Sequence, residues 1–316
     1  MADPDFDRRI LDLARAQANE ELDRRETERA TRIQSFAVAM ADDEGLAELK
    51  AATTLGFADS GPRVVLAEGD SWFDYPGPDI LDYLEDVFDY DVQSLAKATH
   101  RAEDMAYADG QLDDLARKLE KLLADGKAVR AILLSAGGND LLGTEFGMLL
   151  EHVNSGLDPL NPQVVDGVIN LRVRTAYLHI LAKVTQTAIR TVGHPLPILI
   201  HGYAPPVPDG RGVLGGWWFL PGPWMAPGFR DKGLGDTQLE RRKEILVRLI
   251  EIFHRMLREL TELPEFAHVH FVDLAPETLS TGPDYKDFWA NEIHPTKKGF
   301  EIVARRFAEV LAGLPA

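Results

Sequence analysis

The sequence contains no cysteine. This absence excludes disulfide bonds, thiolate metal sites and a cysteine nucleophile, and it leaves the redox compartment open. Basic residues are also scarce, with 34 Lys and Arg against 51 Asp and Glu, and the formal net charge is −17 at pH 7. Because nucleic acids and anionic membrane surfaces are themselves negatively charged, we expect neither as a partner.

Long apolar segments are missing as well. The first 17 residues are charged from the outset and contain no apolar signal-peptide core, and no apolar run approaches the ~18 residues that a membrane span requires. We therefore expect a soluble, cytoplasmic protein without a membrane span. With 316 residues, 45% of them hydrophobic, the chain can bury one large core or two modest ones.

The N-terminal region is dense in Asp, Glu and Arg. Its apolar residues, such as Ile10, Leu11 and Leu22, recur at loosely helical spacing and predict a helical extension over residues 1–60. Two packing partners are possible for this extension: the following domain, or a second copy of the chain, which would make a homo-oligomer. No titratable cluster there has an apolar setting, so we expect no catalytic role.

From residue 61 to residue 316 the pattern alternates between strands and helices. The expected strands are 63–67, 91–96, 129–135, 197–201 and 268–273. The expected helices follow Asp79 and then cover 102–124, 164–192, 237–263 and 295–311. Five strands separated by helices predict a parallel α/β sheet covered on both faces.

The first of these strands ends in the sequence VVLAEGDSWF, which spans residues 64–73. A β-branched apolar run that stops at Gly-Asp-Ser predicts a buried strand with Ser71 at its carboxyl end. Thr99, Asn139 and His294 follow the second, third and fifth strands. Since ligands bind beyond the carboxyl ends of parallel strands, one pocket is expected to gather all four residues.

These residue types are suited to nucleophilic catalysis. A serine hydroxyl attacks only when a base takes its proton, and His294 is the candidate base. The oxyanion that forms needs preorganised donors. We expect them from the backbone N–H of Ser71, a backbone N–H near Thr99 and the side-chain amide of Asn139.

Three sequence blocks carry a family resemblance: GDSW at residues 69–72, GGND at 137–140 and NEIHP at 291–295. With these blocks, residues 61–311 resemble the GDSL-type esterases and lipases of the SGNH hydrolase superfamily. The resemblance implies a flavodoxin-like three-layer sandwich with strand order 2-1-3-4-5, and ester hydrolysis without a metal or cofactor. It also implies Ser71 as nucleophile, His294 as base and Asn139 as oxyanion donor.

The sequence departs from the family pattern at two positions. Thr99 stands where the family has glycine, although only a backbone N–H is required there. Asn291 stands where the family usually has an aspartate, three residues before His294. An amide can orient the imidazole but supplies no charge, so three alternatives stay open: Asp287 or Asp284 reaches the ring, a backbone carbonyl orients it, or the site works as a dyad. We favour a dyad in which Asn291 or a backbone carbonyl holds the imidazole.

Two insertions, at about 141–162 and 203–236, are expected to form lid-like walls around the serine. The second insertion is rich in glycine and proline and holds three of the five tryptophans, Trp217, Trp218 and Trp224. They are expected to contact an acyl, aryl or sugar group, or alternatively to pin the loop to the core. Trp72 is expected either to line the pocket floor or to pack in the core.

Other polar residues have a simpler interpretation. His268 and His270 alternate along the fifth strand and, with Asp273, could hold a metal, but strand histidines are more often hydrogen-bonded, so no metal site is expected. Asp70 and Asp140 are expected to hydrogen-bond backbone amides and fix the two corners that they occupy.

Three functions are consistent with these residues. The favoured one is a serine hydrolase acting on a small-molecule carboxylic ester, such as the ester of a small alcohol, a lipid or an acetylated carbohydrate. The first alternative is a non-catalytic or impaired binding protein on the same fold, which the amide at Asn291 motivates. The second is an acyltransferase, which would use the same residues.

Overall fold

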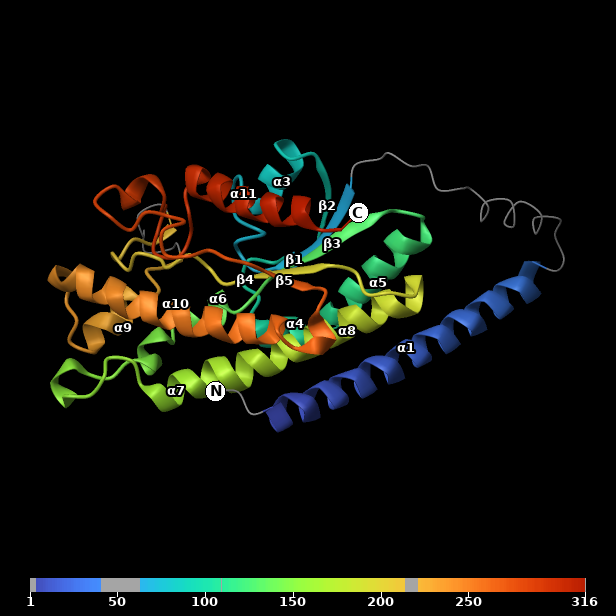
Figure 1. Cartoon of the computed structure of the whole chain (residues 1–316), viewed down its shortest axis with the longest axis horizontal. Coiled ribbons are helices and arrows are strands. Elements are labelled where there is room, and N and C mark those ends of the chain that lie inside the picture. The colour runs from blue at the N-terminus through green and yellow to red at the C-terminus, as the bar shows by residue number, and fades with distance from the viewer. Residues whose placement is uncertain (1–3, 41–62, 109, 214–220, 316) are drawn as a thin grey trace.

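Five parallel strands form the centre of the molecule, in the order β2-β1-β3-β4-β5 (Figure 1). The computed structural model describes residues 4–40, 63–108, 110–213 and 221–315. The strands are β1 (Arg63–Gly69), β2 (Tyr90–Ser94), β3 (Val129–Ser135), β4 (Ile198–His201) and β5 (Val269–Val272). This order confirms the fold class that the resemblance implied.

Helices cover both faces of the sheet. Those of the described residues are α1 (Pro4–Met40), α3 (Ile80–Asp86), α4 (Ala102–Tyr107), α5 (Gln111–Ala124), α6 (Gly138–Leu141), α7 (Pro162–Asp166), α8 (Arg174–Val192), α9 (Ala226–Asp231), α10 (Leu239–Thr261) and α11 (Lys297–Gly313). Figure 1 shows α3 and α11 on one face, and α4, α5, α8 and α10 on the other. The result is the expected three-layer sandwich.

Strand β1 lies in the interior of the sheet, between β2 and β3. Its residues Val64, Val65, Leu66 and Ala67 are at most 1% exposed, as a parallel strand covered on both faces requires. Burying a side chain of the size of valine or leucine contributes about 1.5–3 kcal/mol. The strand is therefore a rigid support for the turn that follows it.

Two predicted helices are interrupted in the structure. The helix expected over 102–124 is divided into α4 and α5, because the chain passes through Gly110, whose φ of +74° favours glycine. The helix expected over 164–192 begins earlier, at Pro162, and contains a π-helical segment, Gly167–Val173, between α7 and α8. Neither feature has a signal in hydrophobic periodicity.

The last helix, α11, begins two residues later than expected. Thr296 caps it, because its Oγ1 accepts the backbone N–H of Gly299 at 3.2 Å. Pro295 instead forms an isolated bridge with Trp289. This shift leaves His294 in the loop before the helix rather than next to its first turn.

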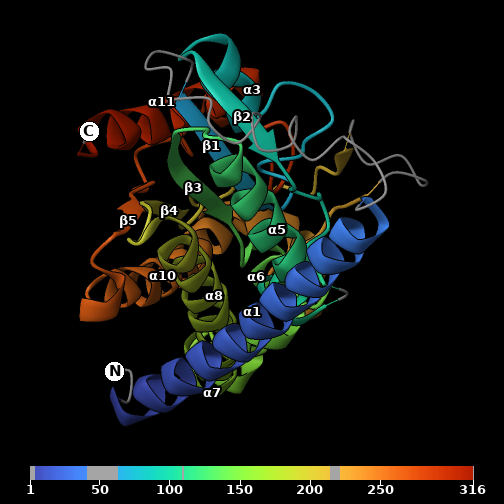
Figure 2. The same cartoon turned by 90° about the vertical axis from the view of Figure 1, so that its right-hand side faces the viewer.

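The N-terminal helix α1 lies along α8 (Figure 2), and its residues Leu11, Ala14, Ala18 and Leu22 are buried. Buried ion pairs reinforce the contact. One joins Asp7 to Arg174 of α8, with nitrogen–oxygen distances of 2.8 and 2.6 Å.

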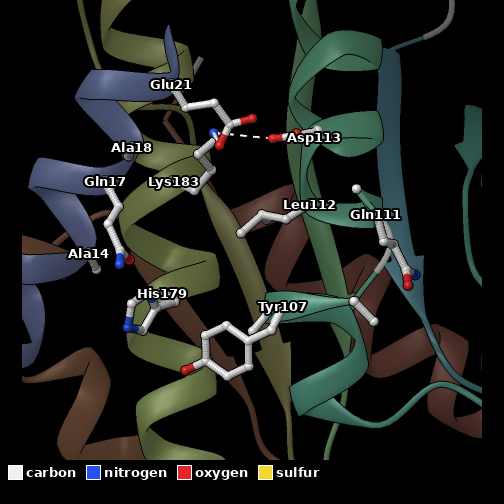
Figure 3. Close-up of a pocket in the computed structure, with 13 residues that line it drawn as sticks. Ala14, Gln17, Ala18, Glu21, Tyr107, Gln111, Leu112, Asp113, His179 and Lys183 are labelled. Carbon is white, nitrogen blue, oxygen red and sulfur yellow. Dashed lines mark hydrogen bonds and ion pairs between the residues drawn. The ribbon is translucent and has the colours of Figure 1, made fainter.

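A second ion cluster joins α1 to two helices of the domain. Lys183 of α8 lies between Glu21 of α1 and Asp113 of α5 (Figure 3). The cavity beside this cluster has a volume of about 200 Å³. Of the two packing alternatives for the extension, the structure thus shows contact with the domain. None of the helices in the described ranges combines the length and the apolar character needed to cross a bilayer.

Candidate active site

Ser71 and His294, 223 residues apart in sequence, meet at the carboxyl end of β1. The Oγ atom of Ser71 lies 2.8 Å from Nε2 of His294. Both residues are buried, with 8% and 5% of their surface exposed. This distance is within the range at which an imidazole can take a proton from a hydroxyl.

The turn that carries Ser71 is fixed by its neighbour Asp70. The carboxylate of Asp70 accepts the N–H of Trp72 at 3.0 Å, the hydroxyl of Ser135 at 2.9 Å and the hydroxyl of Tyr203. Burial raises the pKa of Asp70 to about 6, although these hydrogen bonds act in the opposite direction. The hydrogen bond to the Trp72 amide is the type of contact expected for Asp70.

The other nitrogen of His294 faces Asn291. Nδ1 lies 3.1 Å from Oδ1 of Asn291, and the same oxygen accepts the backbone N–H groups of Ile293 at 3.0 Å and of His294 at 2.9 Å. The two backbone N–H groups directed at this atom identify it as the carbonyl oxygen, which can only accept. Nδ1 must then carry the proton, which leaves Nε2 free to accept the Ser71 hydroxyl proton.

The two alternative acids have other contacts. The carboxylate of Asp284 accepts the hydroxyl of Ser280 at 2.5 Å, and Asp287 contributes its backbone carbonyl to Thr296 at 2.7 Å.

Burial alone lowers the pKa of His294 to about 3. Its imidazole is therefore neutral at pH 7.

Asn139 has a more engaged side chain than expected. Its Nδ2 donates to the backbone carbonyl oxygens of Ala98 at 3.2 Å and of His100 at 2.8 Å. Both amide hydrogens thus hold the turn that carries Thr99, an exposed residue between them. The weaker of the two bonds, to Ala98, is the one that an oxyanion would have to replace or share.

Backbone donors at the site remain free. In the part of the chain that the structure describes, the N–H groups of Ser71 and Thr99 have no hydrogen-bond acceptor. Asp140, next to Asn139, accepts the N–H of Ala102 at 2.8 Å, which matches the structural role expected of it. Burial raises the pKa of Asp140.

A narrow pocket opens beside the Ser71 hydroxyl. Its free volume is about 10 Å³, the space of a single water molecule. The lining residues come from the turns that carry Ser71 and Asn139, from the loop before His294 and from both predicted insertions: Asp70, Ser71, Trp72, Gly138, Asn139, Leu142, Tyr203, Ala204, Pro206 and Ile293. The pocket therefore brings Ser71 and Asn139 to one cavity.

The tryptophans have different surroundings. Trp72 is 4% exposed, donates its indole N–H to the carbonyl of Ile293 at 3.1 Å, and packs edge-on against Tyr203. It thus lines the pocket and packs in the core at once. Trp224 is half-buried, with its ring edge-on to His294 at a centroid distance of 5.7 Å. Trp217 and Trp218 lie outside the described residues.

Glu292 is a residue that no sequence pattern singles out. Its fully buried carboxylate accepts four backbone N–H groups at 2.6–3.1 Å, from Gly210, Trp224, Met225 and Ala226. These four donors lie in the second insertion, whereas Glu292 lies between Asn291 and His294. The carboxylate therefore ties the insertion to the loop that carries the imidazole.

Glu68 and Tyr75 are also absent from the residues predicted from the sequence. Glu68 is 1% exposed in β1 and accepts the side-chain amide of Gln111 at 2.7 Å, and burial raises its pKa to about 7. The ring of Tyr75 lies 4.7 Å from that of His294. The sequence contains a signal for Glu68, because an acidic residue stands inside an apolar run, but it contains none for Tyr75.

The two strand histidines do not gather around a metal. His268 is hydrogen-bonded to the hydroxyl of Thr185 at 2.8 Å, and Asp273 is paired with Arg258. Among the residues described, no group of three or more His, Asp or Glu side chains is placed to bind a metal ion.

Several solved structures are similar to this chain. A catalytic mutant of Axe2, an acetylxylan esterase from Geobacillus stearothermophilus, is 14% identical, with 82% of this chain and 98% of that chain covered and a TM-score of 0.44. A member of the lipolytic G-D-S-L family from Veillonella parvula is 13% identical, with 80% and 100% covered and a TM-score of 0.43. LAE5, an alpha/beta hydrolase enzyme from the metagenome of Lake Arreo, is 12% identical, with 83% and 100% covered and a TM-score of 0.42.

No protein-family model matches the chain, and no curated protein matches it in sequence. Likenesses this distant leave the activity and the substrate open. The function therefore has to be argued from the site itself.

Proposed function

We propose that this protein is a serine hydrolase of the SGNH type that cleaves carboxylic esters. The observation that carries the proposal is the 2.8 Å contact between Ser71 Oγ and His294 Nε2, in the tautomer that leaves Nε2 as the acceptor. A buried serine hydroxyl next to a neutral imidazole is the arrangement that nucleophilic catalysis requires.

The proposed reaction has two halves. In the first, Ser71 Oγ attacks the ester carbonyl carbon while His294 Nε2 takes the hydroxyl proton. The tetrahedral oxyanion then collapses, and the imidazolium gives that proton to the departing alcohol, which leaves an acyl-serine. In the second, His294 takes a proton from a water molecule as the water oxygen attacks the acyl carbon, and the imidazolium then returns a proton to Ser71 Oγ as the tetrahedral intermediate collapses to the acid and the free serine.

Donors for the oxyanion are the free backbone N–H groups of Ser71 and Thr99, joined by the Asn139 amide when it releases Ala98. The narrow pocket favours a small acyl group, because its free volume is close to that of one water molecule. Acetyl esters of small alcohols or carbohydrates fit it better than lipids do. None of these steps uses a metal, so activity is expected to survive EDTA.

The test measures hydrolysis of p-nitrophenyl acetate, butyrate and octanoate, together with labelling by a fluorophosphonate. We expect turnover that falls with acyl length, covalent labelling at Ser71, and loss of both in Ser71→Ala. Ser155→Ala, which removes an exposed serine, is the matched control. Absence of turnover on every ester combined with absence of labelling would refute the proposal and favour a non-catalytic binding protein.

A further inference from the structure

Glu68 is an exception in the strand that leads to Ser71. The four residues before it in β1 are apolar and buried, and Glu68 itself is only 1% exposed. Its Oε1 accepts the side-chain N–H of Gln111 at 2.7 Å and the backbone N–H of Gly69 at 3.1 Å, whereas its buried Oε2 has no hydrogen-bond partner among the described residues. A carboxylate in such a place is costly, because burial removes its hydration. A core residue that lowers stability is a candidate for a functional role.

Gln111, the first residue of α5, connects Glu68 to a second segment of the chain. Its side chain points away from Lys183 (Figure 3), and its Nε2 contacts both Glu68 Oε1 and Nδ1 of His100. The amide nitrogen carries two hydrogens and can donate to both atoms at once, which makes Nδ1 of His100 an acceptor. Nδ1 lies 3.8 Å from Glu68 Oε1, too far for a direct hydrogen bond. Burial lowers the pKa of His100, which agrees with a neutral ring held through the glutamine.

His100 closes the turn that carries Thr99. The backbone holds the start of this turn, where Lys97 donates its N–H to the carbonyl of Gly69 at 2.9 Å. The end of the turn is held by the imidazole of His100 and by its carbonyl, which accepts the Asn139 amide at 2.8 Å. Because the Asn139 amide is also a proposed oxyanion donor, the imidazole is an anchor of the turn that takes no part in the reaction.

We propose that Glu68 and Gln111 are positioning residues for the proposed hydrolysis, on which this inference rests: they connect the two turns whose free N–H groups would bind the oxyanion, and so fix the spacing of these donors. Glu68 accepts a hydrogen bond at the start of the Ser71 turn. Through Gln111 it also holds His100, the residue after Thr99. Oxyanion donors stabilise the transition state because they are preorganised. The described residues that line the pocket beside Ser71 include neither Glu68 nor Gln111, so the effect is expected on kcat rather than on KM.

The kinetic test uses Glu68→Leu, Gln111→Leu and the double variant. Each is expected to lower kcat about 10-fold with KM unchanged, because displacing a donor costs less than the ~100-fold loss that follows the removal of one. The double variant should lose no more than either single variant, since both residues act along one chain of contacts. Gln93→Leu, which removes the 2.6 Å hydrogen bond from Gln93 to Asp91 in β2, is the matched control and should keep kcat.

The stability of the same variants separates positioning from structural support. Glu68→Leu leaves the amide of Gln111 and the N–H of Gly69 without their acceptor, so it should lower the midpoint of unfolding by denaturant. The double variant removes the Gln111 amide together with its acceptor, and replacing both partners by apolar groups can be nearly neutral. Most of the midpoint should therefore be recovered in the double variant while kcat stays low. A kcat that recovers together with the midpoint would overturn the inference.

A third measurement is independent of turnover. Nitrogen–proton NMR spectra of protein labelled with nitrogen-15 threonine report the backbone amide of Thr99, which is assigned by its absence in Thr99→Gly. We expect one sharp Thr99 resonance in the wild type and in Gln93→Leu. In the Glu68 and Gln111 variants we expect this resonance to broaden or divide, because the turn is no longer held in one position.

These measurements distinguish a failure of the inference from a failure of the proposed function. If the wild type hydrolyses esters while kcat and the Thr99 resonance are the same in the three variants, the inference is wrong and the proposed function stands. If the variants change the resonance but the wild type cleaves no ester, the connection between the two turns holds and the proposed hydrolysis fails.

Discussion

Replacing Asn291 by aspartate is expected to raise the activity and to move its pH dependence. The substitution conserves the shape of the side chain and keeps an oxygen for the three N–H groups that Oδ1 now accepts. It adds a negative charge about one hydrogen bond away from Nδ1 of His294. The imidazolium that forms during catalysis gains most from that charge.

The size of the effect follows from the geometry. The oxygen is 3.1 Å from Nδ1, and the charge centres of the two groups are separated by roughly 4 Å. At an effective dielectric constant of about 20, two unit charges at that separation interact by about 4 kcal/mol. Since one pKa unit corresponds to ~1.4 kcal/mol, the pKa of His294 should rise from about 3 toward about 6.

The increase in rate should be smaller than the full charge–charge interaction energy would give, because the new carboxylate loses hydration in a buried site. We expect kcat/KM to rise by about 10- to 100-fold, well below the ~10⁴ that separates the acid from the amide in the serine-protease example. The neutral imidazole is the active form, and a nearby negative charge favours the protonated form. The acid limb of the kcat/KM profile must therefore move to higher pH.

The assay is initial-rate hydrolysis of p-nitrophenyl acetate between pH 4 and pH 9, chosen as a working range. Asn154→Asp, on an exposed turn, controls for the added charge. If Asn291→Asp left both the rate and the acid limb unchanged, Nδ1 of His294 would not face residue 291 in solution, and the description of the site would be wrong.

Three further predictions concern single contacts. Glu292→Ala leaves four buried N–H groups without their acceptor and should lower the free energy of unfolding by about 4 kcal/mol, measured with denaturant; Glu292→Gln should lose less, and a loss below about 1 kcal/mol for the alanine variant would contradict the tie. Asn139→Ala should lower kcat by about 100-fold, whereas Thr99→Gly should stay near wild type; a fall under about 3-fold for Asn139→Ala would exclude the amide from the oxyanion site. Asp7→Ala removes one of the two carboxylates paired with the buried Arg174 and leaves Glu259 as its partner, so it should cost about 2 kcal/mol in thermal or chemical unfolding without changing kcat at 25 °C; unchanged stability would show that α1 is not docked in solution.

The sheet was predictable because its signals are local. Each strand is a short apolar run, and Ser71, Asn139 and His294 follow strands whose carboxyl ends share one edge. The break between α4 and α5 was not predictable in the same way. Its cause is the backbone conformation at Gly110, and a glycine at that point does not by itself end a helical pattern.

The candidate site was predictable only for residues whose chemistry is visible in the sequence. Tyr75 and Glu292 make contacts across the fold, and neither a tyrosine after a turn nor a glutamate before a histidine is unusual. Asn139 shows the same limit, although its residue type did lead to a prediction. Its amide type suggested an oxyanion donor, but the carbonyl groups of Ala98 and His100 that it binds could not be inferred without coordinates.

The four hydrogen bonds that Glu292 accepts restrict the movement of the residues that donate them. Gly210, Trp224, Met225 and Ala226 cannot move outward without pulling on the loop that carries His294. Substitutions at these residues that widen the pocket entrance for a larger substrate should therefore also affect proton transfer by His294. In the proposed hydrolase, the single carboxylate of Glu292 therefore couples substrate binding to proton transfer.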